Sequence, residues 1–311
     1  MIHLVCPNPA IDRTLLVDNF GESLPNRPYE VKEFLGGKGF NVAYAIGFEE
    51  PNIPFCVHTI AGGRNGEYLE ELAKANNVPV VFTKIESNTR VCNIIMDTKN
   101  HLTYPIYENS FELNEALLME YTDALKKAVE PGDYIVFSGS LMKGMPSNYI
   151  ADFIEEFREK RVKIFVDTSG DALRQAYQEK PYAIKINDEE ILDIFPDVKL
   201  DTFESYIALL ASDAAAEIPV FIITLGEKGI VAKINDQIFA VKAKEVKAKN
   251  PIACGDFFLG GLVKNLALGE TPEKTLKMAI SYSTANVLSW YPELDKQAID
   301  EIYHSLSITQ Y

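Results

Sequence analysis

Positive charge is in short supply in this sequence. Its 311 residues include 30 lysines and arginines but 45 aspartates and glutamates, which gives a formal net charge of -15 at pH 7. A field of that sign repels polyanions over long distances, so we expect neither nucleic acid nor an anionic membrane as a partner. A small phosphorylated ligand remains compatible with the composition, because it responds mainly to the cations beside it.

Cysteines and long apolar runs are also scarce. The four cysteines, at positions 6, 56, 92 and 254, show neither metal-type nor redox-type spacing and suit a reducing cytosol. A helix N-terminus can lower a thiol pKa, but we interpret Cys254 as a packing residue. No basic region precedes a long apolar core near residue 1, and no apolar run approaches the length that a bilayer requires. We therefore expect a cytoplasmic protein.

Two common nucleotide-binding sequences are missing. No Gly-Lys pair is followed by Ser or Thr as in a Walker A loop, and no glycines have the spaced Gly-x-Gly-x-x-Gly pattern of dinucleotide-binding folds. A phosphate-binding site would therefore depend on other glycine-containing segments. Two such segments are present.

The first segment, residues 250–256, reads Asn-Pro-Ile-Ala-Cys-Gly-Asp and runs into an apolar helical pattern. Its proline and glycine fit a tight turn, and the N–H groups at a helix N-terminus suit a phosphate in transfer. A carboxylate at Asp256 could accept the proton of an attacking hydroxyl while those amides neutralise developing charge. Alternatively, Asp256 only favours the helix dipole.

The second segment, residues 35–43, reads Leu-Gly-Gly-Lys-Gly-Phe-Asn-Val-Ala and also leads into a helix. Its glycines let the backbone approach a ligand closely, while Lys38 and Asn41 offer a cation and an amide. Two such helix entrances, far apart in sequence, indicate two ligands in one cleft. Taken alone, the glycine run also fits a flexible loop beside a helix end.

Eight short motifs follow one another along the chain, at residues 8–12, 36–41, 89–93, 138–141, 167–170, 185–190, 224–229 and 253–256. Together and in this order they resemble the ribokinase-like (PfkB) carbohydrate kinases, and more narrowly the branch of 1-phosphofructokinase and tagatose-6-phosphate kinase. The resemblance extends from about residue 1 to about residue 290. It implies a single ribokinase-like domain over residues 1–311.

Short apolar runs that are typical of buried strands alternate with stretches of helical spacing. The strand-like runs cover residues 2–6, 55–60, 134–138, 162–167, 183–186 and 220–224. The helix-like stretches cover residues 66–76, 114–129, 147–160, 171–178 and 202–216. This alternation predicts an α/β fold with a mostly parallel central sheet between two layers of helices, which is the three-layer α/β/α arrangement that the resemblance implies.

Polar residues follow several of the strand-like runs. Because ligands bind at the carboxyl ends of strands in such sheets, we expect one cleft there. The residues at or just after such ends are Asp12, Ser138, Asp167, Asn187 and Thr224.

Two regions, about 12–35 and 89–108, break the alternation. Their strand-like segments are 13–17, 29–34, 91–97 and 102–107, and they predict a small accessory sheet. The resemblance implies that this sheet is a lid over the sugar and a possible contact in a homodimer. A lid has a physical reason, because phosphoryl transfer to a sugar must exclude water. A simple hairpin elaboration is the alternative.

The resemblance assigns roles where residues match. ATP would lie toward the C-terminal half, with Asp256 as the general base and the amides of Ala253, Cys254 and Gly255 as an anion hole. The implied sugar-site residues are Asp12, Gly36, Gly37, Asn41, Asn93 and Ser138. Asn187 and Glu190 resemble an Asn-x-x-Glu element that supports Mg²⁺, with Glu190 acting through water, although they also fit a helix entrance. The other implied ATP contacts are Lys185, Thr224, Gly226, Gly229, Gly255 and Asn286, the last near the adenine.

Three cations bear on the substrate. Lys38, Arg90 and Arg27 match positions that hold the phosphate already present on a sugar phosphate, although Arg27 also fits a plain surface charge. Two charge-assisted contacts would favour a phosphorylated sugar by about 3–6 kcal/mol. We therefore expect a small-molecule sugar phosphate as the partner, namely fructose 1-phosphate, fructose 6-phosphate or tagatose 6-phosphate, with ATP and Mg²⁺ as cofactors.

Two departures from the family pattern keep alternatives open. Ala253 stands where the family has glycine, so an anion hole that needs a positive φ there would be strained. Residues 102–108 also depart from the branch's Leu-Asn-x-Pro-Gly-like stretch. The alternatives are a kinase for an unphosphorylated sugar or nucleoside, and a nucleotide- or sugar-phosphate-binding sensor with weakened catalysis.

Overall fold

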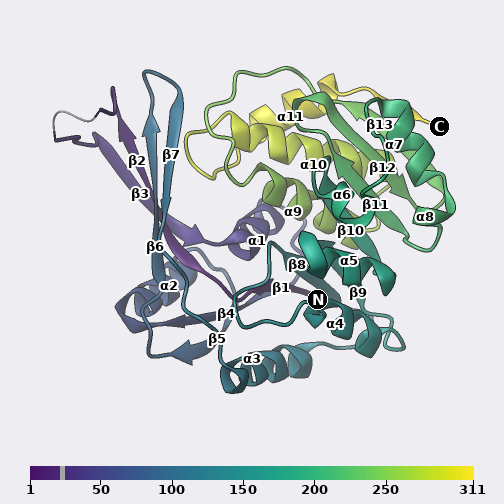
Figure 1. Ribbon diagram of the computed structural model, residues 1–311. Coiled ribbons are helices and arrows are strands. Elements are labelled where there is room, and N and C mark those ends of the chain that lie inside the picture. The colour runs from purple at the N-terminus through teal and green to yellow at the C-terminus, as the bar shows by residue number, and fades with distance from the viewer. Residues whose placement is uncertain (22–24) are drawn as a thin grey trace.

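The structure is a computed structural model that describes residues 1–21 and 25–311. Residues 22–24, which fall within the predicted lid region 12–35, lie outside the described residues. Figure 1 shows a large body with a small upright sheet at one side.

The body is organised around one ten-stranded sheet in the order β14-β13-β12-β11-β10-β9-β8-β1-β4-β5. Strands β11 to β5 in this order are parallel, and β12, β13 and β14 are antiparallel. The strands are β1 Ile2–Cys6, β4 Phe55–Gly62, β5 Val80–Ile85, β8 Tyr134–Ser138, β9 Lys163–Asp167, β10 Ala183–Asn187, β11 Val220–Thr224, β12 Gly229–Ile234, β13 Gln237–Lys242 and β14 Ile308–Gln310. The predicted mostly parallel sheet is confirmed, and all six predicted strands occur.

Helices cover both faces of this sheet and bury two separate apolar clusters. One face carries α1 Lys38–Gly47, α2 Gly63–Ala75, α9 Cys254–Ala267, α10 Pro272–Val287 and α11 Lys296–Ser305. The other carries α3 Glu115–Ala128, α4 Tyr149–Phe157, α5 Gly170–Gln178, α6 Ile191–Ile194, α7 Phe203–Leu210 and α8 Asp213–Ala216. The three-layer α/β/α arrangement is therefore confirmed.

The helix predicted over residues 202–216 is wrong in one respect, because the structure divides it. Helix α7 ends at Leu210 and α8 begins at Asp213. The Ser212 side chain accepts a hydrogen bond from the Ala214 N–H, so it caps a new helix rather than continuing the old one. Serine favours such caps over helix interiors for this reason.

The upright sheet has four strands, as predicted for the accessory sheet, and their order is β3-β2-β6-β7. They are β2 Ala10–Val17, β3 Glu30–Gly36, β6 Arg90–Asp97 and β7 Leu102–Tyr107. Its inner face packs through Leu16, Ile94 and Met96 against Tyr291 of the loop after α10. The upright sheet thus stands at one side of the body and contacts the segment that follows α10 (Figure 1).

Helices α1 and α9 lie side by side, in contact along their length. Gly260 permits this approach, because a Cβ at that position would lie 2.5 Å from Ala45 Cβ. One turn further, the buried Lys264 Nζ donates to the carbonyls of Phe48 at 2.5 Å and Glu49 at 2.7 Å. This contact brings the N-termini of the two glycine-entered helices to the same place.

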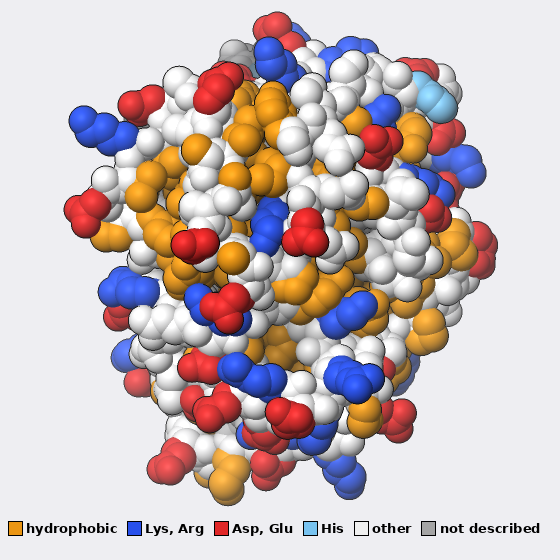
Figure 2. Space-filling view, turned by 90° about the vertical axis from the view of Figure 1, so that its right-hand side faces the viewer, with side chains coloured by type: hydrophobic (Ala, Val, Ile, Leu, Met, Phe, Trp, Pro, Cys, Tyr) orange, Lys and Arg blue, Asp and Glu red, His pale blue; other side chains and the backbone are white. Residues whose placement is uncertain are grey.

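The surface carries charges of both signs. Figure 2 shows acidic and basic side chains interspersed on one face, with hydrophobic side chains between them. Within residues 1–21 and 25–311, no helix combines the length and apolar character needed to span a membrane.

Candidate active site

A cavity of about 570 Å³ lies where the upright sheet meets the N-termini of α1 and α9. Strand ends of the large sheet, the inner face of the small sheet and the loop before α9 all contribute to its lining. The predicted site residues that line it are Asp12, Gly37, Lys38, Asn41, Arg90, Ser138, Ala253, Cys254, Gly255 and Asp256. The two glycine-containing segments therefore share one cleft.

The loop before α9 has the form of an anion site. The N–H groups of Asp256 and Phe257 both donate to the Ala253 carbonyl at 2.9 Å. The first amides of a helix have no intrahelical acceptor, which leaves those of Cys254 and Gly255 at the cavity for a ligand. Ala253 itself has φ 65° and ψ 1°, the left-handed conformation that favours glycine.

The Asn286 side chain supports this loop through a hydrogen bond. It is fully buried and its Nδ2 donates to the Ile252 carbonyl at 2.8 Å. The Asn286 side chain has no exposed surface, so it does not itself contact a ligand, and its position near the adenine of a nucleotide stays a prediction. Its physical role is to hold the backbone at Ile252 in place.

Cys254 is half-buried and lines the cavity, and the direction of its pKa shift does not favour a reactive thiolate. Burial raises its pKa to about 11, although it is the first residue of α9. Desolvation therefore outweighs the helix dipole at this position. Its place in the site comes from its backbone amide.

Replacing Ala253 by glycine is expected to stabilise the protein. An alanine in the left-handed conformation destabilises the folded state by about 1–2 kcal/mol. The greater freedom of glycine in the unfolded chain lowers the stability of the variant by only about 0.4–1 kcal/mol, so the net change is stabilising. Thermal unfolding of Ala253→Gly should therefore occur a few degrees higher, with roughly 2–4 °C for each kcal/mol in a chain of this size. The matched control is Ala267→Gly, at the last residue of α9, which should unfold at a lower temperature. A lower unfolding temperature for Ala253→Gly would show that the alanine is not strained.

Asp256 is the residue where the two halves of the cleft meet. It is 3% exposed, and its carboxylate accepts from Asn41 Nδ2 at 2.9 Å and lies 3.4 Å from Lys38 Nζ. Burial raises the pKa of Asp256, while Lys38 opposes that shift and Asp167 adds to it. A buried carboxylate with a raised pKa and a nearby cation is suited to accept a proton.

Lys38 lies at the Asp256 end of the cleft. Its aliphatic stem passes over Gly139, where a Cβ would lie 2.6 Å from Lys38 Cδ and where φ is 95°. The charge of Asp256 is the main cause that raises the Lys38 pKa to about 12, and Asp167 and Glu190 act in the same direction. Lys38 is thus held beside the predicted base, among carboxylates.

Arg90 lies instead on the inner face of the upright sheet, at the start of β6. Its guanidinium makes long hydrogen bonds of 3.4 Å to the carbonyls of Asn8 and Pro9. It also acts on Asp12, because burial raises the pKa of Asp12 to about 6 and Arg90 opposes that rise. Arg90 and Asp12 therefore place a cation and a carboxyl group on this side of the cavity.

Gly36 makes room for Asp12. A Cβ at Gly36 would lie 2.3 Å from Asp12 Oδ1, so any side chain would displace that carboxylate. Cys92 lies opposite Asp12 in the β2–β6 register and also lines the cavity. Sequence analysis did not single out Cys92, and only the pairing of β2 with β6 reveals it.

Three predicted sugar-site residues do not line the cavity: Gly36, Asn93 and Arg27. Asn93 pairs with Arg13 across the β2–β6 ladder, so it lies on the face opposite to Asp12 and Cys92. Alternation of side chains along a strand explains this, because Arg90, Cys92 and Ile94 line the cavity and the residues between them point away. Arg27 is exposed on the segment before β3 and does not line the cavity.

The predicted nucleotide side begins at the next strands of the large sheet. Lys185 is buried and lies 3.3 Å from Asp167, and a Cβ on Gly255 would lie 3.1 Å from Lys185 Nζ. A cation thus stands beside the amides at the start of α9. In the described part of the chain, the buried side-chain atoms without a hydrogen-bond partner include Ser138 Oγ, Asp167 Oδ2 and Thr168 Oγ1. Such atoms at a strand edge are expected where a ligand supplies the missing partners.

Asn187 and Glu190 form the helix entrance that the sequence allowed. The Asn187 side chain accepts from the N–H groups of Glu189 and Glu190, and Glu190 Oε2 accepts from the Asn187 N–H at 2.9 Å. One carboxylate oxygen of Glu190 is thereby used. Burial raises the pKa of Glu190, with Asp167 adding to the rise.

A magnesium ion would find few protein ligands here. Residues 1–21 and 25–311 contain no group of three His, Cys, Asp or Glu side chains arranged to hold a metal. Mg²⁺ commonly keeps several waters and uses one or two carboxylates plus substrate phosphates. Asp167, whose Oδ2 has no partner, and Glu190, whose second oxygen is not used in the cap, fit that sparse requirement.

Thr224, Gly226 and Gly229 follow the end of β11. Thr224 Oγ1 donates to the Ile186 carbonyl at 3.2 Å. Gly226 is exposed with φ 58° and open space around its Cα, whereas a Cβ on Gly229 would lie 2.0 Å from the Val241 carbonyl oxygen. Gly226 is therefore accessible to a ligand, and Gly229 is required by the β12–β13 hairpin.

Comparisons with known proteins agree with this architecture. Residues 3–293 match the family described as pfkB family carbohydrate kinase. The tagatose-6-phosphate kinase of Staphylococcus epidermidis is 27% identical over 313 residues, covering 100% of both chains. Phosphofructokinase-2 from Escherichia coli, solved in complex with substrates and products, superposes with TM-score 0.88 at 22% identity, covering 97% of this chain and 98% of that one. A structure described as "possible 1-phosphofructokinase" from Thermotoga maritima gives TM-score 0.86 at 22% identity, covering 100% and 99%. The resemblance and the ribokinase-like fold inferred from the sequence are confirmed.

Proposed function

The chain belongs to the pfkB family of carbohydrate kinases, and we propose that it transfers the γ-phosphoryl group of ATP to a ketohexose monophosphate, which yields the bisphosphate. The observation that carries this proposal is the position of Asp256. It is a buried carboxylate held by Asn41 at the start of α9, beside Lys38 and the free amides of the loop. This arrangement combines a base with a site for transferred charge.

In the proposed reaction, Asp256 accepts the proton of the sugar hydroxyl as that oxygen forms a bond to the γ-phosphorus. The bond between the γ-phosphorus and its bridging oxygen breaks, and ADP leaves. The amides of Ala253, Cys254 and Gly255 and the ammonium groups of Lys38 and Lys185 would stabilise the charge on the transferring group. Such electrostatic stabilisation is most effective where the donors are already in place.

The resident phosphate of the sugar is assigned to Arg90. Lys38 was also expected there, but its contact with Asp256 favours a role at the transferred group. Arg90 lies beside Asp12 on the inner face of the upright sheet, where it could bind one end of a sugar while a hydroxyl at the other end faces Asp256. Bidentate binding of phosphate is typical of arginine.

The relatives named above indicate which sugar phosphate should be tested first. Tagatose-6-phosphate kinase is 27% identical over the whole chain, so tagatose 6-phosphate is the first substrate to test, with fructose 6-phosphate and fructose 1-phosphate beside it. We propose ATP as the donor and Mg²⁺ as its companion, held by Glu190 and Asp167 through water or directly. When bound, Mg²⁺ would neutralise charge on the nucleotide phosphates.

The decisive experiment measures ADP formation with ATP and Mg²⁺ over the three sugar phosphates and the corresponding free sugars. Turnover on one phosphate ester and little on its free sugar would support the proposal. Turnover on free sugars or nucleosides alone would contradict the role given to Arg90. ATP binding without turnover on any acceptor would favour a sensor, for which the left-handed Ala253 is the structural argument.

The pH dependence of the KM for the sugar phosphate is expected to report the protonation of Asp12. Its pKa is raised to about 6, so it is charged and able to accept sugar hydroxyls above that pH, and it becomes neutral as the pH falls through 6. We therefore expect the KM for the sugar phosphate to rise below about pH 6, while the KM for ATP changes less. A sugar phosphate itself titrates near pH 6, so the control is Asp12→Asn with the same substrate. Equal pH dependence of the sugar KM in both proteins would contradict this role.

We also propose that the outer face of the upright sheet pairs with a second copy of the chain. Val31 and Ile106, on the two edge strands, are 47% and 54% exposed, and the strand registers place them on the face away from the cavity. Exposed apolar surface of this kind marks interaction sites. Sedimentation velocity at micromolar concentration should give a dimer, and Val31→Lys with Ile106→Lys should give a monomer. A monomeric unmodified protein would end this proposal.

A further inference from the structure

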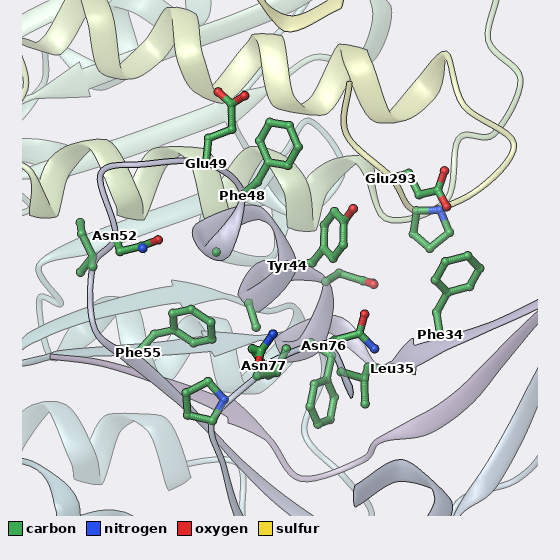
Figure 3. A pocket seen from close by; sticks show the side chains of 18 of the residues that line it. Phe34, Leu35, Tyr44, Phe48, Glu49, Asn52, Phe55, Asn76, Asn77 and Glu293 are labelled. Atoms are coloured by element: carbon green, nitrogen blue, oxygen red, sulfur yellow. The ribbon is translucent and has the colours of Figure 1, made fainter. Parts of the chain in front are cut away.

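A second cavity, of about 810 Å³, lies along α1 and reaches the C-terminal end of that helix. Its lining comes from the end of β3, from α1, from the loop before β4, from the turn after α2 and from Pro292 and Glu293. Figure 3 shows Tyr44 of α1, Phe48 directly after α1 and Phe55 of β4 around the cavity, with Glu49 and Glu293 toward two of its ends. Cavities of this size accommodate small organic molecules.

The interior of this cavity is aromatic and apolar. Phe34, Tyr44, Phe48 and Phe55 contribute rings, and Ile53, Val78 and three prolines add aliphatic surface. Tyr44 is 38% exposed, so much of its ring is available to a ligand. Such a lining favours a ligand with a flat, apolar body.

The polar groups around the cavity carry charge of one sign. Glu33, Glu49 and Glu293 line it, together with four asparagines, and no lysine, arginine or histidine is among the described residues that do so. Glu33 is already bound by Arg13 and Tyr68, at 2.6 and 2.7 Å. Glu49 and Glu293 are partly exposed, and each is paired only with a solvent-exposed lysine, at 3.1 and 3.7 Å. These two carboxylates can exchange a lysine for a ligand cation.

We propose that this cavity binds a small organic cation, an amine on an aromatic body. The ring would pack among the side chains of Tyr44, Phe48 and Phe55, and the ammonium group would lie at one end of the cavity, beside Glu49 or Glu293. Carboxylates attract the cation, and the faces of aromatic rings do so as well. The carboxylates of Glu49 and Glu293, which form the rim of the cavity, would repel a sugar phosphate or a nucleotide. The site is therefore chemically distinct from the active site.

The cavity shares structural elements with the active site. Asn41, which holds Asp256, lines both cavities. Residues 33–35 of β3 line this cavity and lead directly into Gly36 and Gly37. A ligand bound here therefore contacts the helix and the strand that position the sugar site. Any effect of the amine on sugar binding must be matched by an equal effect of the sugar on amine binding.

Isothermal titration calorimetry on the whole protein tests the binding step without turnover. The probes are phenethylamine, 2-phenylethanol and phenylacetate, which share one ring and differ in charge. We expect one binding site for phenethylamine. The affinity for the alcohol should be lower by about tenfold or more, and the acid should not bind. Glu49→Gln with Glu293→Gln should lower phenethylamine affinity by about tenfold or more. The control is Glu120→Gln with Glu159→Gln, which removes the same charge from exposed positions on α3 and beyond α4.

Equal affinity for the three probes, unchanged phenethylamine binding in the rim variant, or no binding at millimolar concentration would each overturn the proposal. Binding that needs the rim carboxylates supports it even if no sugar phosphate is turned over, so this result and the kinase assignment can fail separately. If phenethylamine also changes the affinity for the sugar phosphate, and Glu49→Gln with Glu293→Gln abolishes that change, the two cavities are coupled through α1.

Discussion

Asp256→Asn is expected to reduce kcat by about 10² to 10⁴ while leaving the fold and ATP binding close to those of the unmodified protein. Asparagine keeps the shape of the side chain and can still bond to Asn41, but it cannot take a proton. The measurement is ADP formation at saturating substrates, with ATP binding and thermal unfolding followed in parallel.

The control for this variant is Asp171→Asn. Asp171 also lies in the first turn of a helix, α5, but it is exposed and pairs only with Arg174 on its own helix. If Asp256 served only the helix dipole, the two variants would lose similar, small amounts of stability, about 0.3–1 kcal/mol, and little activity. Full activity of Asp256→Asn would therefore remove the proposed base.

Arg90→Met should raise the KM for the sugar phosphate by roughly 10- to 150-fold, which corresponds to one charge-assisted contact of about 1.5–3 kcal/mol. The KM for ATP should change little, because Arg90 lies on the upright sheet rather than beside Lys185. Discrimination between the phosphorylated and the free sugar should fall by the same factor. Steady-state kinetics with both acceptors measures each quantity.

Arg13→Met is the matched control, since Arg13 lies in the same sheet but on its outer face, where it pairs with Glu33. The control should keep the selectivity for the phosphate ester. Equal losses in the two variants would mean that the sheet has been disturbed, and loss in neither would place the phosphate elsewhere in the cleft.

The sequence predicted the body of the fold because its strands are buried on both faces. Continuous apolar runs such as 134–138 and 220–224 mark such strands, and both match the structure to the residue. The edge strand β5 was not predicted, since its exposed and buried positions mix and its apolar run is weak. The hairpin of β12 and β13 was also missed, because it departs from the alternation of strands and helices that guided the interpretation.

Some residues of the site could be brought together from the sequence, and others could not. Asp256, Lys38 and Asn41 could be brought together from sequence because two helix N-termini in one cleft suggested it, and the structure places them in contact. Asn93 and Asn286 could not be placed, since one depends on strand register and the other on the burial of a single helix face. The left-handed conformation of Ala253 was expected only conditionally, because one residue type does not fix its own φ.

The contact between α1 and α9 also bears on how the protein is made. Asn41 and Asp256 are 215 residues apart in the chain, and they meet only through the packing of these two helices around Gly260. During synthesis from the N-terminus, the sugar side and most of the large sheet emerge before the base and the anion loop exist. A growing chain therefore cannot complete the proposed site, or cover this face of the large sheet, until the helices from α9 onward, in the last fifth of the polypeptide, have been made.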